Sequence, residues 1–407
     1  MGWVTEHAPI ASEVNTCIQC GLCLPSCPTF RLTGRETASP RGRLTAMAAV
    51  VDGFPVDQSF ADIMGSCLQC RACEVVCPAF VPFGKTMEAA RVEVSAQHHT
   101  RGRGVRRLLV GRALRSRRLL RLSALGAWVV QRGRLWFLVP KQLRGGLRGM
   151  RRIDARASSI AGTNRSSIGP PRGVAAVLSG CVMDSWFSGV HEATIEVLAR
   201  AGYDVVVPNA QTCCGALAAH DGWADDARAM AEINVSAFED ADVVVVNSAG
   251  CGAHLKEYEH WADEGARVAA VTRDITEVVA DAINSRYLPV VDATGGSVAI
   301  QDPCHLRHAQ RIIEQPRTVL EAAGLTVVEI DVAGQCCGAA GLYSILEPEL
   351  SGQLGAAKAA QVVAAGQSVV ASANPGCEMQ LRSHLADQVR VAHPVELYLE
   401  ALQEAGL

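Results

Sequence analysis

Short apolar runs alternate with longer helix-like stretches from residue 173 to the C-terminus. The runs are three to six residues long and rich in β-branched side chains, which is typical of buried strands. They are Val174–Leu178, Tyr203–Val207, Val243–Val246, Val298–Ile300, Leu325–Ile330 and Val369–Ala371. Stretches with helical character, such as Val190–Ala201 and Pro316–Ala323, lie between them. This alternation predicts α/β units with parallel sheets.

The cysteines of this region indicate an internal repeat. Each copy has one Cys, then a Cys-Cys-Gly triplet, then one further Cys. The two copies are Cys181, Cys213, Cys214, Gly215 and Cys251, and Cys304, Cys336, Cys337, Gly338 and Cys377. Corresponding cysteines are 123 residues apart, or 126 residues for the last one. The spacing therefore predicts two similar domains, at residues 173–288 and 289–407.

The single cysteines of each copy come directly after predicted strands. Because ligands gather at the carboxyl ends of parallel strands, we expect the four thiols of each copy to converge. The glycine after each Cys-Cys pair allows a tight bend, so that neighbouring sulfurs need not point to opposite faces. Four converging thiolates suit zinc or an iron–sulfur cluster, in each copy or at one shared site. The alternative is that these cysteines serve as small buried apolar side chains and bind no metal.

A second cysteine pattern, C-x2-C-x2-C-x3-C followed by proline, occurs twice near the N-terminus. Its members are Cys17, Cys20, Cys23, Cys27 and Pro28, and Cys67, Cys70, Cys73, Cys77 and Pro78. Three thiolates at this spacing bind three corners of a cubane, and the fourth ligates the other cluster. The pattern predicts two [4Fe–4S] clusters, held by Cys17, Cys20, Cys23 and Cys77, and by Cys67, Cys70, Cys73 and Cys27.

These patterns predict an α+β multidomain protein in four parts. Residues 1–100 form a mainly helical, ferredoxin-like domain, with a helical stretch at Arg43–Val51 between the two motifs. Residues 101–172 form a basic helical segment that ends in a linker at Ser158–Pro171, where Ser, Gly and Pro are frequent. The two α/β Cys-Cys-Gly domains follow.

The composition is that of an ordinary folded protein, with 19% charged and 49% hydrophobic residues. A length of 407 residues suits about two to four domains. No apolar run reaches the ~18 residues of a spanning helix, and the first residues lack the pattern of a signal peptide. All sixteen cysteines fall within the motifs, which favours metal ligands over disulfides and indicates a reducing cytoplasm.

Positive charge is concentrated in one segment. Between Arg101 and Arg156 lie sixteen Arg, Lys141 and a single acid, Asp154, so this segment carries +16 and the rest −19 of a total of −3. Arginines interleave with leucines there, and an aromatic–aliphatic stretch follows. The arginines are Arg103, Arg106, Arg107, Arg112, Arg115, Arg117, Arg118 and Arg121, and the apolar residues include Leu108, Leu109, Leu114, Leu119, Leu120, Leu122, Leu125, Trp128, Val129, Leu135, Trp136, Phe137 and Leu138.

Two interpretations of this basic segment remain open. It lies on anionic headgroups at a membrane surface, or it is a helical linker whose arginines contact an acidic partner subunit. Four glycines interrupt its helical pattern, namely Gly104, Gly111, Gly126 and Gly133. Nucleic acid is not expected as a partner, because the acidic remainder of the chain would repel it.

The chain resembles the iron–sulfur subunit of glycolate oxidase over nearly its whole length, and several uncommon motifs carry this resemblance. They are Cys17–Pro28, Pro40–Leu44 (PRGRL), Cys67–Pro78, Ser179–Val182, Cys213–Ala216, Asn247–Tyr258, Asp302–Gln310, Cys336–Tyr343 and Asn374–Leu381. The wider group includes heterodisulfide reductase, the lactate-utilisation iron–sulfur protein and one of the subunits of anaerobic glycerol-3-phosphate dehydrogenase. The resemblance implies an FAD-bearing partner subunit and electron transfer towards quinone, on the inner face of the cell membrane.

One departure from the family pattern concerns the end of each repeat. Heterodisulfide reductase ends its repeats with C-x-x-C, giving five thiols for a noncubane cluster, whereas this chain has His254 and Gln380 at the final positions. His254 is a candidate imidazole ligand or a histidine without a special role. His305 and His308, beside Cys304, are candidate donors to sulfur, quinone-site residues or plain surface histidines.

Three hypotheses for function follow. The chain carries no P-loop, no credible GxGxxG and no Ser-His-Asp or HExxH set, so we expect no catalytic residue and no flavin or substrate site in it. The leading hypothesis is the electron-transfer subunit of a 2-hydroxy-acid dehydrogenase, with glycolate ahead of lactate, 2-hydroxyglutarate and glycerol 3-phosphate. The alternatives are a disulfide reductase and a zinc-bound docking scaffold.

Overall fold

The computed structural model describes residues 2–98, 103–135, 137, 139, 141–153, 159–292, 295–385 and 387–407. Some residues named above lie outside these ranges, namely Arg101, Trp136, Leu138, Asp154, Arg156 and Ser158. The side chains of Arg103 and Lys141 are likewise outside the description.

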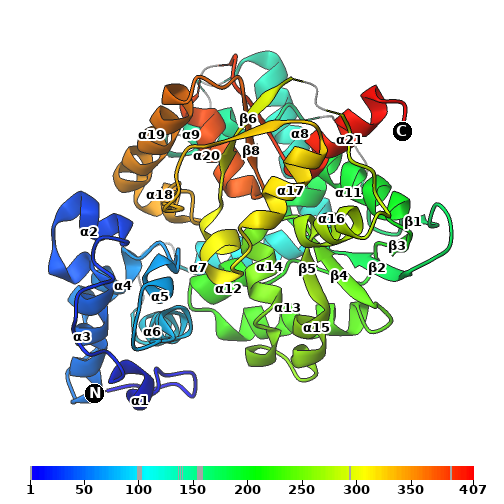
Figure 1. The fold of residues 1–407 in the computed structure, drawn as a ribbon. Coiled ribbons are helices and arrows are strands. Elements are labelled where there is room, and N and C mark those ends of the chain that lie inside the picture. Colours follow the sequence, from blue (N-terminus) through cyan, green and yellow to red (C-terminus); the bar gives the residue numbers. More distant parts are fainter. Residues whose placement is uncertain are drawn as a thin grey trace.

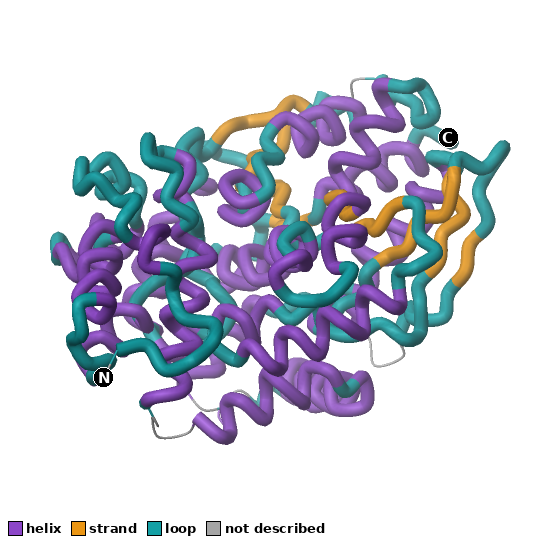
Figure 2. The backbone as a smooth tube through the Cα atoms, turned by 90° about the horizontal axis from the view of Figure 1, so that it is seen from below, coloured by secondary structure: helices purple, strands orange, loops and turns teal. Residues whose placement is uncertain are grey.

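The N-terminal part is built from helices and loops, as predicted (Figures 1 and 2). Ser39 and Asp57 accept hydrogen bonds from main-chain N–H groups and so begin α3 and α4. Met47, Met64 and Met87 are fully buried where α3, α4 and α6 pack together. The helices are α1 (Ala11–Val14), α2 (Pro28–Thr33), α3 (Pro40–Val51), α4 (Gln58–Gly65), α5 (Ala72–Val75) and α6 (Phe83–Gln97).

The first α/β unit contains a five-stranded sheet in the order β1-β3-β2-β4-β5. All neighbouring strands are parallel except β1 and β3. Successive residues of β2 face opposite sides, because Ala175 and Val177 join one buried cluster whereas Ala176 joins another. The strands are β1 (Asn164–Arg165), β2 (Gly173–Val177), β3 (Tyr203–Val206), β4 (Val243–Val246) and β5 (Thr272–Asp274).

Helices cover both faces of this sheet, which is why its central strands are apolar on both sides. They are α10 (Val182–Trp186), α11 (Ser188–Arg200), α12 (Ala216–His220), α13 (Ala224–Ala237), α14 (Ala249–Leu255), α15 (Gly265–Val271) and α16 (Ile275–Asn284).

The second α/β unit repeats this design with a fully parallel four-stranded sheet in the order β7-β6-β8-β9. Its strands are β6 (Ser297–Gln301), β7 (Thr326–Glu329), β8 (Val369–Ser372) and β9 (Arg390–Ala392). Its helices are α17 (Glu314–Ala322), α18 (Tyr343–Leu346), α19 (Pro348–Ala364), α20 (Pro375–His384) and α21 (Pro394–Glu404). The predicted α+β multidomain class with parallel sheets is therefore confirmed.

The two α/β units share one hydrophobic core. Val319 from α17 and Tyr398 from α21 are buried in the same cluster as Ile275 from α16 and Val190 from α11. In Figure 1, α17 and α16 lie side by side between the two sheets. Neither repeat therefore buries its apolar surface alone.

The basic segment is more helical than its glycines suggest. It contains α7 (Arg103–Arg107), a π-helical turn (Leu108–Arg112), a 3₁₀ turn (Ala113–Arg115), α8 (Arg117–Gly133) and α9 (Lys141–Gly149). The expectation that Gly126 interrupts a helix is wrong, because α8 passes through it and packs Ala124 and Ala127 against Met150. Within the described residues, no helix combines the length and apolar character needed to cross a bilayer.

The predicted linker at Ser158–Pro171 is not simply a connection. Asn164 and Arg165 form the edge strand β1, which pairs antiparallel with Val206 and Val205 of β3. No apolar run marks β1, because two exposed residues can join a sheet edge through main-chain hydrogen bonds alone.

Candidate iron–sulfur and thiol sites

The first N-terminal motif surrounds a small cavity with the last cysteine of the second motif. Cys17, Cys20, Cys23 and Cys77 all line this cavity of about 30 Å³, beside Cys73. Cys20 is exposed, so this site lies at the surface of the protein. The structure thus brings together the four cysteines predicted to hold the first cluster. The assignment of the ligands themselves stays a prediction.

The loops of the two motifs have matching backbone conformations. Gln19 and Gln69 have φ of 59° and 52°, and the residues two positions later, Gly21 and Arg71, have φ of 81° and 61°. These left-handed residues turn each loop back on itself, so that three successive cysteines can face one side. Glycine is the usual residue for this conformation. The first motif has Gly21 at this position, whereas the second motif has Arg71.

The cysteines predicted to hold the second cluster are buried. Cys27, Cys67, Cys70 and Cys73 are each less than a tenth exposed, in contrast to Cys20. Burial, together with the nearby thiolates of Cys27 and Cys67, raises the pKa of Cys70 and Cys73 well above the ordinary value. Such thiols ionise only beside a compensating positive charge, which bound iron would provide. The donor set therefore fits a cluster in this position.

Arg43 lies beside this second group of cysteines and is 1% exposed. Its Nη1 is 3.9 Å from Cys27 Sγ, and its Nη2 donates to Thr29 Oγ1 at 3.1 Å and to Ser66 Oγ at 2.9 Å. Only the place of this arginine in the PRGRL motif pointed to it in the sequence. A buried cation beside a ligand sulfur is a means of setting a cluster potential.

In the first α/β unit the four repeat cysteines approach one another in two pairs. Cys181 follows β2 and lies 3.5 Å, sulfur to sulfur, from Cys213. Cys214 lies 3.2 Å from Cys251, which is on α14 after β4. Gly215, with φ of 95°, turns the loop between the pairs.

The second unit has the same arrangement. Cys304 follows β6 and is 4.0 Å from Cys336, and Cys337 is 3.1 Å from Cys377 on α20. Gly338 has φ of 85° and again turns the Cys-Cys loop. The thiols of each copy thus lie at the carboxyl ends of parallel strands and approach one another in two pairs. Their convergence on one metal site stays a prediction.

Both groups of thiols open into one cavity of about 1320 Å³. Its lining includes all eight repeat cysteines and also Cys67 of the second N-terminal motif. Apolar side chains from α8, α9 and the loop before α18 complete it, among them Val130, Leu147 and Leu342. This volume exceeds the roughly 300–1,000 Å³ of ordinary ligand pockets.

The close sulfur contacts are pairwise. In the part of the chain that the structure describes, no three His, Cys, Asp or Glu side chains lie close enough to hold a single metal ion. Hydrogen bonding with Cys181 lowers the pKa of Cys213, and hydrogen bonding with Cys336 lowers that of Cys337. Cys213 and Cys337 therefore ionise more readily than an ordinary thiol, which suits metal ligation because the thiolate is the form that binds a metal.

The buried N-terminal site lies against the thiols of the second unit. Cys70 and Leu68 form one apolar cluster with Cys336 and Tyr343, and Cys304 packs against it. Tyr343 Oη also donates to the main-chain oxygen of Ser66 at 3.3 Å. Two predicted metal sites that are at least 231 residues apart in sequence thus meet through van der Waals contacts.

Within the described residues, none of the candidate histidines forms a hydrogen bond with a sulfur. His305 Nε2 donates to the main-chain oxygen of Gln69 at 2.9 Å, and His308 Nε2 donates to that of Gly334 at 2.9 Å. The hypothesis that they donate to sulfur finds no support in these bonds. His254 is buried, and its Nε2 has no hydrogen-bond partner among the described residues.

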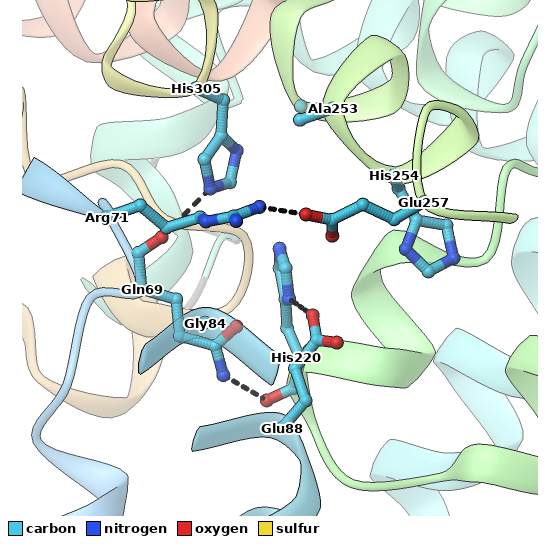
Figure 3. A pocket seen from close by; sticks show the side chains of 10 residues that line it. Gln69, Arg71, Gly84, Glu88, His220, Ala253, His254, Glu257 and His305 are labelled. Atoms are coloured by element: carbon cyan, nitrogen blue, oxygen red, sulfur yellow. Dashed lines mark hydrogen bonds and ion pairs between the residues drawn. The ribbon is translucent and has the colours of Figure 1, made fainter. Parts of the chain in front are cut away.

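A small polar cavity between the N-terminal part and the first α/β unit was not predicted (Figure 3). Arg71 bonds Glu257, and His220 Nδ1 donates to Glu88 at 2.8 Å. Burial lowers the pKa of His220 to about 3 and that of His254 to about 4, so both are neutral near pH 7. Arg71, His254 and Glu257 lie within motifs named above, whereas Glu88 and His220 lie outside them. The replacement of a motif glycine by Arg71 was the one sequence signal for this cavity.

Family comparisons agree with this arrangement of sites. A model described as a 4Fe-4S dicluster domain matches residues 13–81, and one described as a cysteine-rich domain matches residues 175–256 and 298–382. Together they define the class: a dicluster iron–sulfur protein with two cysteine-rich domains.

Proteins with similar sequences indicate which family within this class the chain resembles. The chain is 34% identical over 418 residues to the probable glycolate oxidase iron-sulfur subunit of Bacillus subtilis, covering 96% of this chain and 94% of that protein. It is 29% identical over 405 residues to the glycolate oxidase iron-sulfur subunit of Escherichia coli, covering 97% and 95%. Lactate utilization protein A of Bacillus cytotoxicus is 29% identical over 53% of this chain and 95% of that protein. The chain belongs to the family of glycolate oxidase iron–sulfur subunits.

Proposed function

We propose that this chain is the electron-transfer subunit of a membrane-associated, FAD-dependent 2-hydroxy-acid dehydrogenase, with glycolate as the first candidate substrate. The family supports an iron–sulfur subunit of an oxidoreductase. The hydroxy acid and the flavin would bind a partner subunit, and electrons would pass to quinone at the inner face of the cell membrane. The domain boundaries at residues 101, 173 and 289 are part of this proposal.

Cys17, Cys20, Cys23 and Cys77 would hold one [4Fe–4S] cluster, and Cys67, Cys70, Cys73 and Cys27 the other. When bound, such clusters accept and release single electrons at potentials tuned by charge, hydrogen bonds and exposure. The eight repeat cysteines would hold one or two further iron–sulfur clusters or zinc. Exposed Cys20 makes the first site the natural point of contact with the flavin subunit.

The observation that carries the proposal is the contact of Cys70 with Cys336 and Tyr343. It joins the buried N-terminal site to the repeat thiols through an apolar cluster. Arg91 stabilises the same region, because its guanidinium donates to the main-chain oxygens of Cys67 at 2.6 Å and His220 at 2.7 Å. These contacts support the proposal that the two kinds of site lie next to each other.

The test is an anaerobic pull-down of the tagged chain from membranes, followed by electron paramagnetic resonance. Glycolate, D-lactate, 2-hydroxyglutarate or glycerol 3-phosphate is added in turn. Reduction by one of them supports the proposal and identifies the substrate. If dithionite reduces the clusters of a preparation that retains the flavin partner, while none of these substrates does, the proposal is wrong and a disulfide reductase becomes the better hypothesis.

Metal analysis of the same preparation separates the remaining alternatives. More than about eight irons per chain without zinc indicates further clusters at the repeat cysteines. About eight irons with one or two zincs indicates that the repeats form a structural scaffold.

A further inference from the structure

Helix α8 (Arg117–Gly133) has two different faces. Leu120, Ala124 and Ala127 are buried against the protein. The opposite face exposes four aliphatic side chains, with 44% to 63% of their surface accessible: Leu119, Leu122, Leu125 and Val129. Leu122, Leu125 and Val129 follow one another at intervals of three and four residues and so form a continuous stripe.

Arginines border this stripe. Arg118, Arg121 and Arg132 are exposed, and none of them forms an ion pair within the described residues. Other arginines of the basic segment form ion pairs within the chain. Arg106 pairs with Asp221 at 2.8 Å, and Arg107 pairs with Asp226 at 2.7 Å. The sequence contains no Asp or Glu from Arg103 to Ile153, so nothing on α8 neutralises its charge.

We propose that the exposed face of α8 binds the surface of an anionic lipid bilayer. A helix of 17 residues is about 25 Å long and would lie along the surface, with its leucines at the acyl boundary. The guanidinium groups then meet lipid phosphates, their preferred planar anions. A protein interface would instead centre on aromatic or Met anchors, whereas this stripe is aliphatic and ringed by unpaired cations.

Other residues of the same helix line the thiol cavity. Ser123, Ala127 and Val130 of α8 belong to its lining, together with Leu147 and Met150. Binding through the outer face would therefore bring the cavity within about one helix diameter, 10 Å, of the bilayer. This deepens the proposed function and rests on it only in that the quinone named there would come from the same bilayer.

The test is co-sedimentation of the full, iron-loaded chain with vesicles under anaerobic conditions. Vesicles of phosphatidylcholine alone are compared with vesicles that contain phosphatidylglycerol. We expect binding to the anionic vesicles that weakens steeply as salt rises, because exposed charges are screened. Absence of binding to anionic vesicles at low salt would overturn the inference.

Two sets of substitutions separate the apolar and electrostatic contributions. We expect Leu122→Ser/Leu125→Ser/Val129→Ser and Arg118→Gln/Arg121→Gln/Arg132→Gln each to lower the vesicle partition coefficient at least about tenfold. Matched controls alter exposed residues elsewhere: Val290→Ser/Val332→Ser/Val363→Ser and Arg228→Gln/Arg286→Gln/Arg311→Gln. Equal loss in variants and controls would refute a specific lipid surface.

Further measurements distinguish this inference from the proposed function. Substrate reduction of the clusters in detergent should be unchanged in the α8 variants, so a failure of the electron-transfer proposal leaves the vesicle result standing. Loss of the flavin partner from the α8 variants, with vesicle binding retained, would show that the surface contacts a protein instead. Fluorescence of Leu122→Trp should be quenched by brominated lipids, and unchanged fluorescence would count against contact with the acyl boundary.

Discussion

At the scale of single residues, the side chains beside the cysteines are as informative as the cysteines. Arg43 is the clearest case, since a fully buried guanidinium lies 3.9 Å from Cys27 Sγ. Burying a cation is costly unless its donors are satisfied, and four hydrogen bonds to oxygen or sulfur acceptors satisfy this one. The surroundings of position 43 are therefore suited to a buried positive charge beside Cys27.

Replacing this arginine should change a redox potential. We expect Arg43→Gln to lower the midpoint potential of the cluster predicted at Cys27 by on the order of tens of millivolts, because a nearby positive charge favours the more negative, reduced state. Potentiometric titration followed by electron paramagnetic resonance measures it. Arg43→Lys should retain part of the effect, and the control Arg35→Gln, which removes an exposed arginine, should have none. An unchanged potential in Arg43→Gln would contradict the role.

His393 gives a prediction about pH. Its Nδ1 accepts the main-chain N–H of Val395 at 3.2 Å at the start of α21, and burial lowers its pKa to about 4. In the unfolded chain the pKa is near 6.5, so between these values the unfolded state binds a proton that the folded state does not. The free energy of unfolding therefore falls as pH decreases through this window, by up to about 1.4 kcal/mol per pH unit.

The substitution His393→Asn isolates this contribution. Asparagine keeps a side-chain acceptor at the start of the helix but does not titrate. Anaerobic urea denaturation between pH 5 and 6.5 should show a flatter pH dependence for the variant than for the parent. Parallel curves would show that His393 makes no titrating contribution.

At the scale of helices and strands, the strongest patterns were the most predictable. The six apolar runs correspond to β2, β3, β4, β6, β7 and β8, with ends shifted by at most one residue. The short strands β1, β5 and β9 were missed, because two or three residues at a sheet edge need main-chain partners and no apolar run. Of the four glycines expected to interrupt the basic segment, Gly126 does not, because packing of α8 offsets its low helix propensity, whereas α8 ends at Gly133.

Close packing of α9 on α20 gives a prediction at this scale. A methyl group on Gly149 would overlap the main-chain oxygen of Met379, whereas one on Gly146 would meet nothing within 4 Å. We expect Gly149→Ala to reduce the free energy of unfolding by about 1–3 kcal/mol through overpacking. Gly146→Ala, in the same helix, should be neutral or stabilising by up to about 1 kcal/mol. Thermal or urea denaturation compares them, and equal effects would contradict this close contact.

At the scale of the whole molecule, the N-terminal part and the α/β units are joined by polar contacts as well as by Cys70 and Tyr343. Arg71 donates to Glu74 at 2.8 Å and to Glu257, across the interface, in a largely buried cavity (Figure 3). The acids hold the pKa of Arg71 above its ordinary value in spite of burial. Removing one partner of such a pair leaves the other charge buried.

We expect Arg71→Gln to reduce the free energy of unfolding by about 3 kcal/mol and to increase hydrogen exchange in α6 and α14, which both line this cavity. Arg390→Gln, which removes an exposed pair with Glu400, should have little effect. Visible absorption of the clusters should be retained in both variants. Unaltered exchange in Arg71→Gln would mean that the pair does not hold the interface.

The sequence by itself determined the class of protein, the thiol sets and the repeat. Cysteine spacing is a local property, since ligands of one cluster must follow one another at fixed intervals, and strand–helix alternation is equally local. The tertiary structure decided what depends on residues far apart in the chain. It brought Cys70 to Cys336, opened both repeats into one cavity, buried Arg43 beside Cys27 and gathered Arg71, His220 and Glu257 in a polar cavity. No spacing rule records such contacts, because each arises only when separate domains pack against each other.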